Sequence, residues 1–163
     1  MIAIAGADLV LPDRVHRGGS LLIDAGRIVA VETHAIDSPG IERVEHRGRY
    51  VVPGFVDVHV HGVCGHDTLD GGDAVAAIAR HLPRFGVTAF CPTTVACDPS
   101  ILTAVLHEAA ALRAQPEPRA ARVLPAHLES NFISPDFAGA QPTTCLRQVP
   151  ARNDVGKIGR AHV

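Results

Sequence analysis

Strand-like and helical segments alternate through residues 53–147, and this alternation limits the possible folds more than any other feature of the sequence. The strand-like segments are Phe55–Val60, Val87–Cys91 and Arg122–Leu128, and helical patterns lie between them at residues 74–82 and 101–113. The first segment has the valine-rich composition of a buried parallel strand. Repeated strand–helix units of this kind predict an α/β fold of the (β/α)-barrel type. A doubly wound sheet is the alternative, but no glycine-rich phosphate loop follows the first strand.

The predicted barrel is incomplete in this chain. A full barrel needs eight strand–helix units in about 250 residues, whereas this sequence of 163 residues contains three. Three parallel strands on their own would leave open edges and uncovered faces. We therefore interpret residues 53–147 as the first three units of a TIM-like (β/α)8 barrel, and the chain as the front end of a longer protein.

Capping residues predict where the two helices begin and end. Asp73 is expected to cap the first helix, which ends near Gly86 after a last turn disturbed by Pro83. Asp98 and Pro99 provide an N-cap and a proline at the first helical position of the second helix.

Residues 1–52 show the pattern of a small β module that precedes the barrel. Ile2–Leu11 is strand-like, and a further extended segment begins at Tyr50. Ser20–Asp24 and Arg27–Val31 flank a two-residue link, Ala25–Gly26, which predicts a β-hairpin. No helical periodicity occurs before residue 70.

Residues 148–163 lack any helical or strand periodicity. The codons that can encode the last six residues resemble a common sequencing adapter. We therefore expect residues 148–163 to be a non-native tail, and His162 is left out of the candidate sites.

Composition excludes several classes of function. Fifteen basic and seventeen acidic residues give a net charge of −2, and the sequence has no tryptophan, which argues against a nucleic-acid or anionic-membrane surface. No apolar run approaches the roughly 18 residues of a membrane span. The four cysteines form no CxxC pair, and no secretory signal precedes them. We expect a cytoplasmic protein with free thiols.

The strongest candidate for a functional site is the segment PGFVDVHVHG, which begins at Pro53. Alternate residues of a strand share a face, so Asp57, His59 and His61 lie on one face. Neighbouring imidazoles on that face are about 6.6 Å apart at Cα, so both rings can reach one metal ion. The pair lies at the carboxyl end of a barrel strand, where barrel active sites are built. Two buried histidines bonded to backbone are the alternative.

A second candidate lies at the end of the third strand, where His127 and Glu129 share a face. The Glu129 carboxylate completes a His-His-carboxylate set with His59 and His61, which suits zinc or iron. The alternative is a strand-end glutamate that faces solvent. Cys91–Thr94 is interpreted as a polar turn or as part of the same pocket, and Cys64 and His66 as residues of a flexible loop.

With these residues the sequence resembles the amidohydrolase superfamily, and within it the N-acetylglucosamine-6-phosphate deacetylases. The segments GVTAFCPTT, LPAHLESNFISP and GAQP, which begin at Gly86, Leu124 and Gly139, resemble that family in order and spacing. The resemblance covers about residues 1–147. Two departures are Gln141, where a histidine is common, and Ser130–Asn131, where many members have glycine and proline.

The resemblance implies a (β/α)8 barrel with a β-sandwich to which residues 1–52 contribute. It implies hydrolysis of N-acetylglucosamine 6-phosphate to glucosamine 6-phosphate and acetate, with one or two divalent ions, zinc or iron. Glu129 matches a metal ligand, His59 and His61 match the pair that binds a second metal where present, and Ala140 and Gln141 match substrate-contacting positions. The resemblance also implies a homodimer.

The catalytic base implied by the resemblance is an aspartate on a late strand, which this chain does not contain, and further histidine ligands are missing with it. We therefore expect the 163-residue chain to be inactive on its own. Two alternatives are a dihydroorotase-like cyclic amidase and a truncated product without catalytic function. In a dihydroorotase-like site a lysine bridges two metals, at the position where this chain has Glu129.

Overall fold

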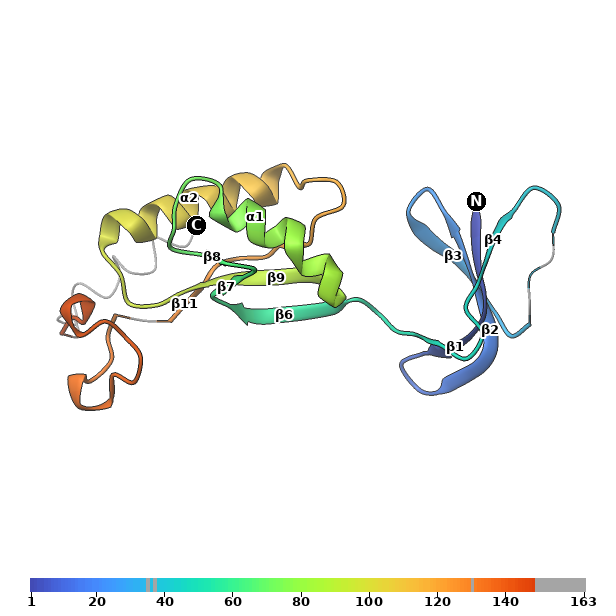
Figure 1. Ribbon diagram of the computed structural model, residues 1–163, viewed down its shortest axis with the longest axis horizontal. Helices are drawn as coiled ribbons and strands as arrows, with labels where there is room; N and C mark the ends of the chain where they lie inside the picture. Colours follow the sequence, from blue (N-terminus) through green and yellow to red (C-terminus); the bar gives the residue numbers. More distant parts are fainter. Residues whose placement is uncertain (35, 37, 130, 149–163) are drawn as a thin grey trace. The chain divides into compact units, whose positions relative to one another are not determined.

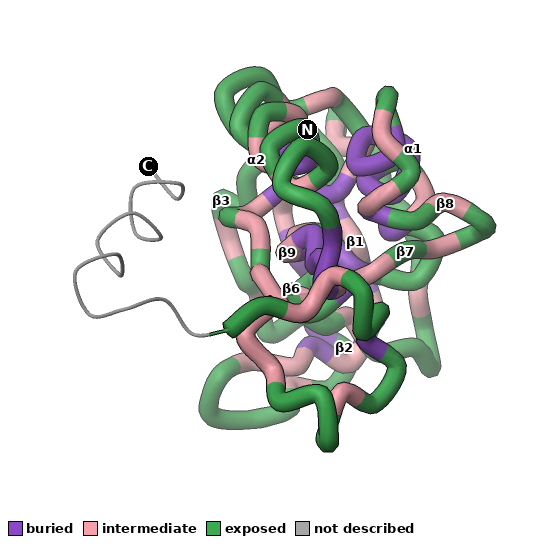
Figure 2. Tube along the Cα trace, turned by 90° about the vertical axis from the view of Figure 1, so that its left-hand side faces the viewer, coloured by how far each residue is buried: buried purple, intermediate pink, exposed green. Residues whose placement is uncertain are grey.

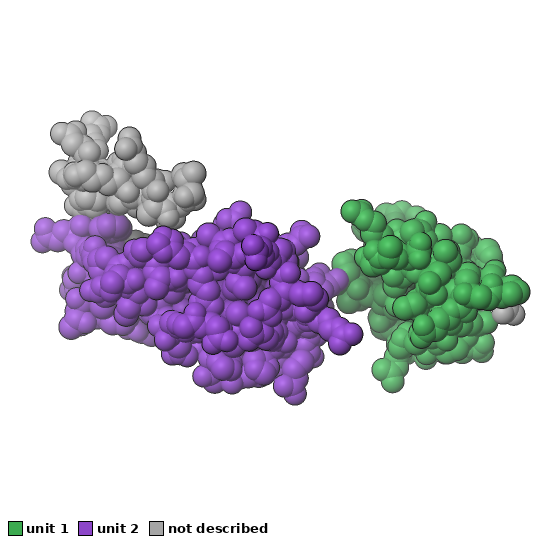
Figure 3. All heavy atoms as spheres, turned by 90° about the horizontal axis from the view of Figure 1, so that it is seen from above, with its two compact units in different colours: residues 1–53 green, residues 54–163 purple. Residues whose placement is uncertain are grey.

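The computed structural model of the protein describes residues 1–34, 36, 38–129 and 131–148. Residues 149–163, which hold nearly all of the predicted non-native tail, and Ser130 lie outside the described residues. The chain divides into two compact units, Met1–Pro53 and Gly54–Val163, which Figure 3 shows in different colours. Each unit has its own sheet, and the candidate site lies in the second.

The first unit is a five-stranded sheet with β1 (Ile2–Val10) at its centre. β2 (Val15–Asp24) pairs antiparallel with β1 and with β3 (Arg27–Glu32). β4 (Glu42–Glu45) and β5 (Tyr50–Val51) both run parallel to β1. The side chains of Ala3, Ala5, Ala7 and Leu9 are buried along one face of β1, which is the alternation expected of a half-buried strand.

The predicted hairpin in this unit is confirmed. Ala25 and Gly26 have φ angles of 46° and 74°, and two successive positive φ angles are the signature of the turn whose twist matches a two-residue hairpin. β4 was not predicted, because its sequence ERVE has no apolar alternation and all four of its residues are exposed.

The second unit is a parallel sheet with β9 (Val87–Thr94) at its centre, which confirms the predicted α/β fold. β6 (Phe55–Val60) pairs with one side of β9, and β10 (Arg122–Val123) and β11 (His127–Leu128) pair with the other. Figure 1 shows α1 (Ala74–His81) and α2 (Pro99–Ala114) on the same face of this sheet. The short elements are β7 (Gly62–Val63), β8 (His66–Asp67) and the 3-10 turns η1 (Leu82–Phe85), η2 (Pro135–Phe137) and η3 (Thr143–Cys145).

The core of the second unit lies between β9 and the two helices. Phe90 of β9 packs with Ile78 of α1 and Val105 of α2, and each of the three is at most 1% exposed. Figure 2 shows the buried residues of α1, which packs onto this core. By contrast, the side chains of Val56 and Val58 on β6 are 59% and 63% exposed. Among the described residues, β6 pairs only with β9.

The third predicted strand, Arg122–Leu128, is divided in two, so the prediction of one continuous strand is wrong. β10 ends at Val123 and β11 begins at His127, and Pro125 lies between them. A proline has no N–H to give to the ladder. The predicted second strand is longer than expected, since β9 runs on to Thr94, and Cys91–Thr94 is therefore strand and not a turn.

The ends of the helices follow the predictions with one exception. The Asp98 carboxylate accepts a hydrogen bond from the Ser100 N–H at 2.8 Å, with Pro99 at the first helical position of α2. Beyond α1 the chain tightens into η1, which contains Pro83, ends at Phe85 and is followed by Gly86 as its C-cap. The exception is Asp73, whose side chain makes no capping bond to α1.

Glu108 of α2 replaces Asp73 as the side chain that caps α1. Its carboxylate accepts a hydrogen bond from the Ala76 N–H at 3.1 Å, so one helix satisfies the free N-terminal donors of the other. Burial raises the pKa of the Glu108 carboxyl, and this effect is larger than the opposing effect of the backbone hydrogen bonds.

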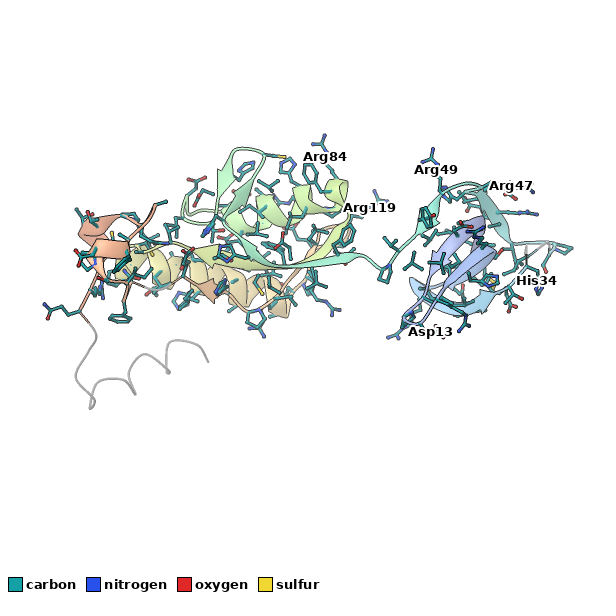
Figure 4. All side chains as sticks on the ribbon, turned by 90° about the horizontal axis from the view of Figure 1, so that it is seen from below. Asp13, His34, Arg47, Arg49, Arg84 and Arg119 are labelled. Carbon is teal, nitrogen blue, oxygen red and sulfur yellow. The ribbon has the colours of Figure 1, made fainter. Side chains whose placement is uncertain are left out.

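Charged side chains lie on the outside of both units. Figure 4 shows Arg84 and Arg119 of the second unit, and Arg47 and Arg49 of the first, as outward-pointing sticks, and all four residues are exposed. Within the described residues, no helix combines the length and the hydropathy that crossing a membrane requires.

Candidate metal centre

The three side chains that the sequence selects as metal ligands come from the two strands on either side of β9. His59 lies near the end of β6, His61 follows that strand directly, and Glu129 follows β11. Because β6 and β11 both run parallel to β9, their carboxyl ends meet at one edge of the sheet. That edge is where ligands bind in parallel α/β sheets.

The donor atoms of these side chains lie close enough to share one ion. The two histidine Nε2 atoms are 3.0 Å apart, and the Glu129 Oε2 lies 3.6 Å from His59 Nε2 and 3.2 Å from His61 Nε2. Around a tetrahedral ion with bonds of about 2.1 Å, neighbouring ligand atoms are about 3.4 Å apart. The three observed distances bracket this value, so the donor set fits a metal ion without rearrangement.

The centre is open to solvent on one side. The side chains of His59, His61 and Glu129 are 48%, 37% and 35% exposed. An open groove of about 450 Å³ runs beside β6 and is lined in part by His59, His61 and Phe85. Two imidazole nitrogens and one carboxylate oxygen suit zinc or iron and leave a coordination position for water or substrate.

A backbone carbonyl orients His61. Its Nδ1 lies 3.2 Å from the Thr93 carbonyl oxygen, which can only accept a hydrogen bond. The Nδ1 therefore carries the proton, and in the neutral ring this leaves the lone pair of Nε2 free to bind a metal. The backbone N–H of His59 is held by the Asp57 carboxylate at 3.1 Å.

His127 also belongs to the surroundings of the centre. Its ring packs edge-on against that of His59, with ring centroids 5.0 Å apart, although His127 is not part of the ligand group itself. Its place on the same strand face as Glu129 was the sequence signal for this proximity.

Cys91 lies in β9 and is not part of the ligand group. Burial raises the pKa of the Cys91 thiol, and the neighbouring Asp57 carboxylate raises it further.

Of the two residues predicted to lie in a loop, Cys64 lies in a turn, whereas His66 is the first residue of β8. They belong to a tight hairpin of β7 and β8, in which Cys64 and Gly65 are the turn residues with φ angles of 53° and 83°. The ring of His66 stacks on that of His81, at a centroid distance of 5.5 Å, so it packs against α1 and is not in the ligand group.

The two residues predicted to contact substrate lie after the η2 turn. Ala140 is exposed. Gln141 is buried, and its amide oxygen accepts a hydrogen bond from the Ala96 N–H at 2.6 Å, which ties its segment to the loop after β9. Neither residue is part of the ligand group.

Asn131 shapes the loop that leaves Glu129. Its amide nitrogen donates to the carbonyl oxygens of Cys97 and Cys145, both at 2.8 Å. The departure from the glycine and proline of the resembling family therefore introduces a side chain that fastens the Glu129 loop to two other segments.

Two buried threonines near the centre have roles that sequence reasoning missed, although Thr93 belongs to the Cys91–Thr94 segment that was a candidate for the pocket. Thr93 follows Pro92 in β9, and Thr68 follows β8. Both hold the end of β6, which carries the histidines. The proline within β9, which has no N–H for the ladder, was a signal in the sequence of irregular pairing at this strand end.

Comparisons with known proteins bear on the identity of this site. No protein-family model matches the chain. The chain is 38% identical over 149 residues to the N-acetylglucosamine-6-phosphate deacetylase of Mus musculus, an alignment that covers 85% of this chain and 36% of that protein. It is 33% identical over 116 residues to the N-acetylgalactosamine-6-phosphate deacetylase of Escherichia coli, covering 71% of this chain and 30% of that protein.

Solved structures agree with these relatives. The N-acetyl-D-glucosamine-6-phosphate deacetylase of Mycobacterium smegmatis superposes with a TM-score of 0.76 at 27% identity, over 99% of this chain and 44% of that one. A variant of the mycobacterial enzyme in complex with N-acetyl-D-glucosamine-6-phosphate superposes with a TM-score of 0.71 at 26% identity, over 99% and 40% of the two chains. This chain spans about a third of the length of the curated relatives it matches. Over that third, the chain is a homologue of the N-acetylglucosamine-6-phosphate deacetylases of the amidohydrolase superfamily.

Proposed function

We propose that this chain provides the metal-binding part of a hydrolase that removes the acetyl group of N-acetylglucosamine 6-phosphate and yields glucosamine 6-phosphate and acetate. The observation that carries the proposal is the convergence of His59, His61 and Glu129 at the carboxyl ends of two parallel strands. The relatives named above are deacetylases of amino-sugar phosphates, and their reaction is the one that we assign to this metal centre.

The proposal includes an incomplete barrel. The second unit contributes the first three strand–helix units of a (β/α)8 barrel, and its free β6 edge and the exposed Val56 and Val58 are the surfaces that further barrel elements would cover. The first unit contributes to a β-sandwich, which agrees with its single described sheet.

His59, His61 and Glu129 are the residues that would hold zinc or iron, as one or two ions. Held there, such an ion would supply Lewis-acid chemistry, which would lower the pKa of a water and polarise the acetamide carbonyl. His61 is ready to bind because its Nδ1–H is held by the Thr93 carbonyl. Glu129 brings a negative charge to the ion and approaches from the strand opposite the histidines.

We place the proton-transfer group of the reaction outside the third of the relatives that this chain matches. Hydrolysis of an amide needs a base that takes the proton of water and delivers it to the leaving amine. We propose that this base is an aspartate of a late barrel strand, in the part of the relatives that this chain does not match. For that reason we expect the 163-residue chain to bind metal but to release no acetate.

Substrate recognition is proposed at Ala140 and Gln141. The amide oxygen of Gln141 is engaged by Ala96, so its amide NH₂ is the group that can donate to a sugar or phosphate oxygen. The N-acetylgalactosamine-6-phosphate deacetylase among the relatives makes the galacto epimer the second candidate substrate. A homodimer in the cytoplasm completes the proposal, and the four free cysteines suit a reducing compartment.

The test is a chimeric enzyme in which residues 1–147 replace the corresponding segment of the mycobacterial deacetylase. We expect the chimera to release acetate from N-acetylglucosamine 6-phosphate. Glu129→Gln in the chimera should lower the rate by more than about 100-fold, since removing only an outer-shell partner of a metal ligand costs 10–100-fold. Acetate release is measured for both sugar epimers. A chimera that folds and binds Zn²⁺ but hydrolyses neither epimer would contradict the proposal.

A further inference from the structure

The end of β6 lacks regular backbone pairing at the point where it presents the metal ligands. The register between β6 and β9 shifts between Asp57 and Val60, and Val60 pairs with Pro92. Proline has no N–H to contribute to the ladder. Regular hydrogen bonds between the strands therefore do not fix the position of the segment from His59 to His61.

Thr93 supplies what the ladder lacks. Its hydroxyl accepts a hydrogen bond from the Val60 N–H at 3.0 Å and donates to the Cys91 carbonyl at 3.1 Å. Its own carbonyl accepts from Nδ1 of His61 at 3.2 Å. The residue is 1% exposed, so water does not compete for these bonds. One residue thus fixes both the strand end and the protonation state of a ligand ring.

Thr68 holds the same segment from the other side. Its N–H donates to the His61 carbonyl at 2.7 Å, and its hydroxyl donates to the Val60 carbonyl at 3.4 Å. It is fully buried. Between them, the two threonines bind the N–H of Val60, the carbonyls of Val60 and His61, and the ring of His61.

We propose that Thr93, supported by Thr68, is the positioning residue of the metal centre: it pre-organises His61 with Nδ1 protonated and Nε2 aimed at the ion. The inference rests on the proposed metal centre, which supplies the ligand role of His61. It extends that proposal by assigning the precision of the site to a hydroxyl group that does not touch the metal.

The test compares Thr93→Val, which keeps the shape of the side chain but removes the hydroxyl, with Thr93→Ser, which keeps the hydroxyl. The dissociation constant of Zn²⁺ is measured on the full chain by competition with a chromophoric chelator. We expect Thr93→Val to weaken binding about 10–100-fold and Thr93→Ser to stay within about threefold of the parent. Val105→Ala, a core truncation in α2, controls for general destabilisation and should leave Zn²⁺ affinity unchanged.

A second readout does not depend on metal. In the metal-free chain at alkaline pH, ¹⁵N chemical shifts of the imidazole rings report which nitrogen of His61 carries the proton. We expect Nδ1–H in the parent and in Thr93→Ser. In Thr93→Val the backbone carbonyl remains, but the bond from the Val60 N–H to the hydroxyl is lost, so the strand end and the His61 ring are no longer held against that carbonyl and a mixture of tautomers is expected. If the parent binds no Zn²⁺, the metal centre is refuted while this readout still decides the role of Thr93.

Three results overturn the inference. The first is that His61 of the parent carries its proton on Nε2. The second is that Thr93→Val has the same Zn²⁺ affinity and the same His61 tautomer as the parent. The third is that Val105→Ala loses as much Zn²⁺ affinity as Thr93→Val. Should Thr93→Val fail to fold, Thr68→Val decides in its place, because its hydroxyl bond is longer and its loss is milder. It should then weaken Zn²⁺ binding by up to about 10-fold, and an unchanged affinity would refute the positioning role of the two threonines.

Discussion

Strands β6 and β9 lie side by side in one sheet, and both begin with apolar residues, but their surroundings differ. β9 has strands on both sides, and its Phe90 is fully buried against the helices. β6 has a described neighbour only on the β9 side, and Phe55, Val56 and Val58 are all more than half exposed. The two histidines of the proposed metal centre nevertheless lie at the end of β6, the less supported strand, and directly after it.

This difference shows how a site can be precise on a strand with weak support. β9 contributes no donor to the ligand group but carries the carbonyl and hydroxyl that hold the end of β6. The buried strand thus acts as the scaffold, and the exposed strand carries the ligands. Such a division keeps the ligands accessible to substrate while their positions are set by a rigid neighbour.

The largest effect should separate the two strands in stability. Phe90→Ala opens a cavity in the core of the second unit and should lower its free energy of unfolding by about 3–5 kcal/mol. Val58→Ala removes methyl groups that are mostly in water and should change it by less than about 0.5 kcal/mol. Urea denaturation of the two variants and the parent measures both. Equal losses would mean that the exposed face of β6 is covered in solution, and the contrast between the strands would disappear.

A second, smaller effect should appear at Gly62, which follows His61. A Cβ at this position would collide with the carbonyl oxygen of His66, because β7 and β8 approach closely there. We expect Gly62→Ala to cost about 1–3 kcal/mol of stability, as overpacking does. It should also weaken Zn²⁺ binding, since the shift begins one residue from a ligand. Denaturation and a Zn²⁺ titration measure the two effects.

The control for Gly62 is Gly65→Ala in the turn of the same hairpin. Gly65 has a φ of 83° and open space around it, so an alanine is strained there without colliding with a neighbour. We expect a loss of about 1 kcal/mol with unchanged Zn²⁺ affinity. If both glycine variants weaken Zn²⁺ binding equally, the hairpin as a whole supports the site and the close approach at Gly62 has no special role.

The sequence predicted the parts of the fold and site that depend on local spacing. The alternation of Asp57, His59 and His61 along one strand placed the two rings on one face, and the equivalent strand end brought Glu129 to them. Turn chemistry predicted the hairpin at Ala25–Gly26. In each case the structure depends on interactions between residues close together in the sequence, so a local sequence pattern is enough to predict it.

The parts that escaped prediction depend on contacts between distant segments. Thr68 and Thr93 looked like ordinary polar residues, and only the register shift of β6 against β9 gives their hydroxyls a function. The side chain that caps α1 is Glu108, which lies on another helix, and not Asp73, which directly precedes α1 in the sequence. The sequence contains Pro125 within the predicted third strand, but the prediction did not divide the strand there, whereas the structure has β10 before this proline and β11 after it.

The smallest expected effect concerns Glu108, which links the two helices that cover β9. Its pKa is raised by burial, so the folded state binds its proton more readily than the unfolded state does. As the pH rises from the usual carboxyl range through the raised pKa, Glu108 therefore costs the folded state stability. Glu108→Gln keeps an oxygen that accepts from the Ala76 N–H but has no charge to bury. We expect this variant to gain stability relative to the parent as the pH rises.

Urea denaturation of the parent and of Glu108→Gln from about pH 4 to pH 8 measures this difference, since groups common to both cancel. Glu108→Ala is the matched control, because it removes the charge and the acceptor together. It should be less stable than Glu108→Gln at every pH, by about 0.5–2 kcal/mol, the usual cost of losing a helix cap. If the free energy of unfolding of the parent instead increased relative to that of Glu108→Gln as the pH rises, the ionised carboxylate would stabilise the contact. The pairing of α1 and α2 over β9 would then depend on a charged cap.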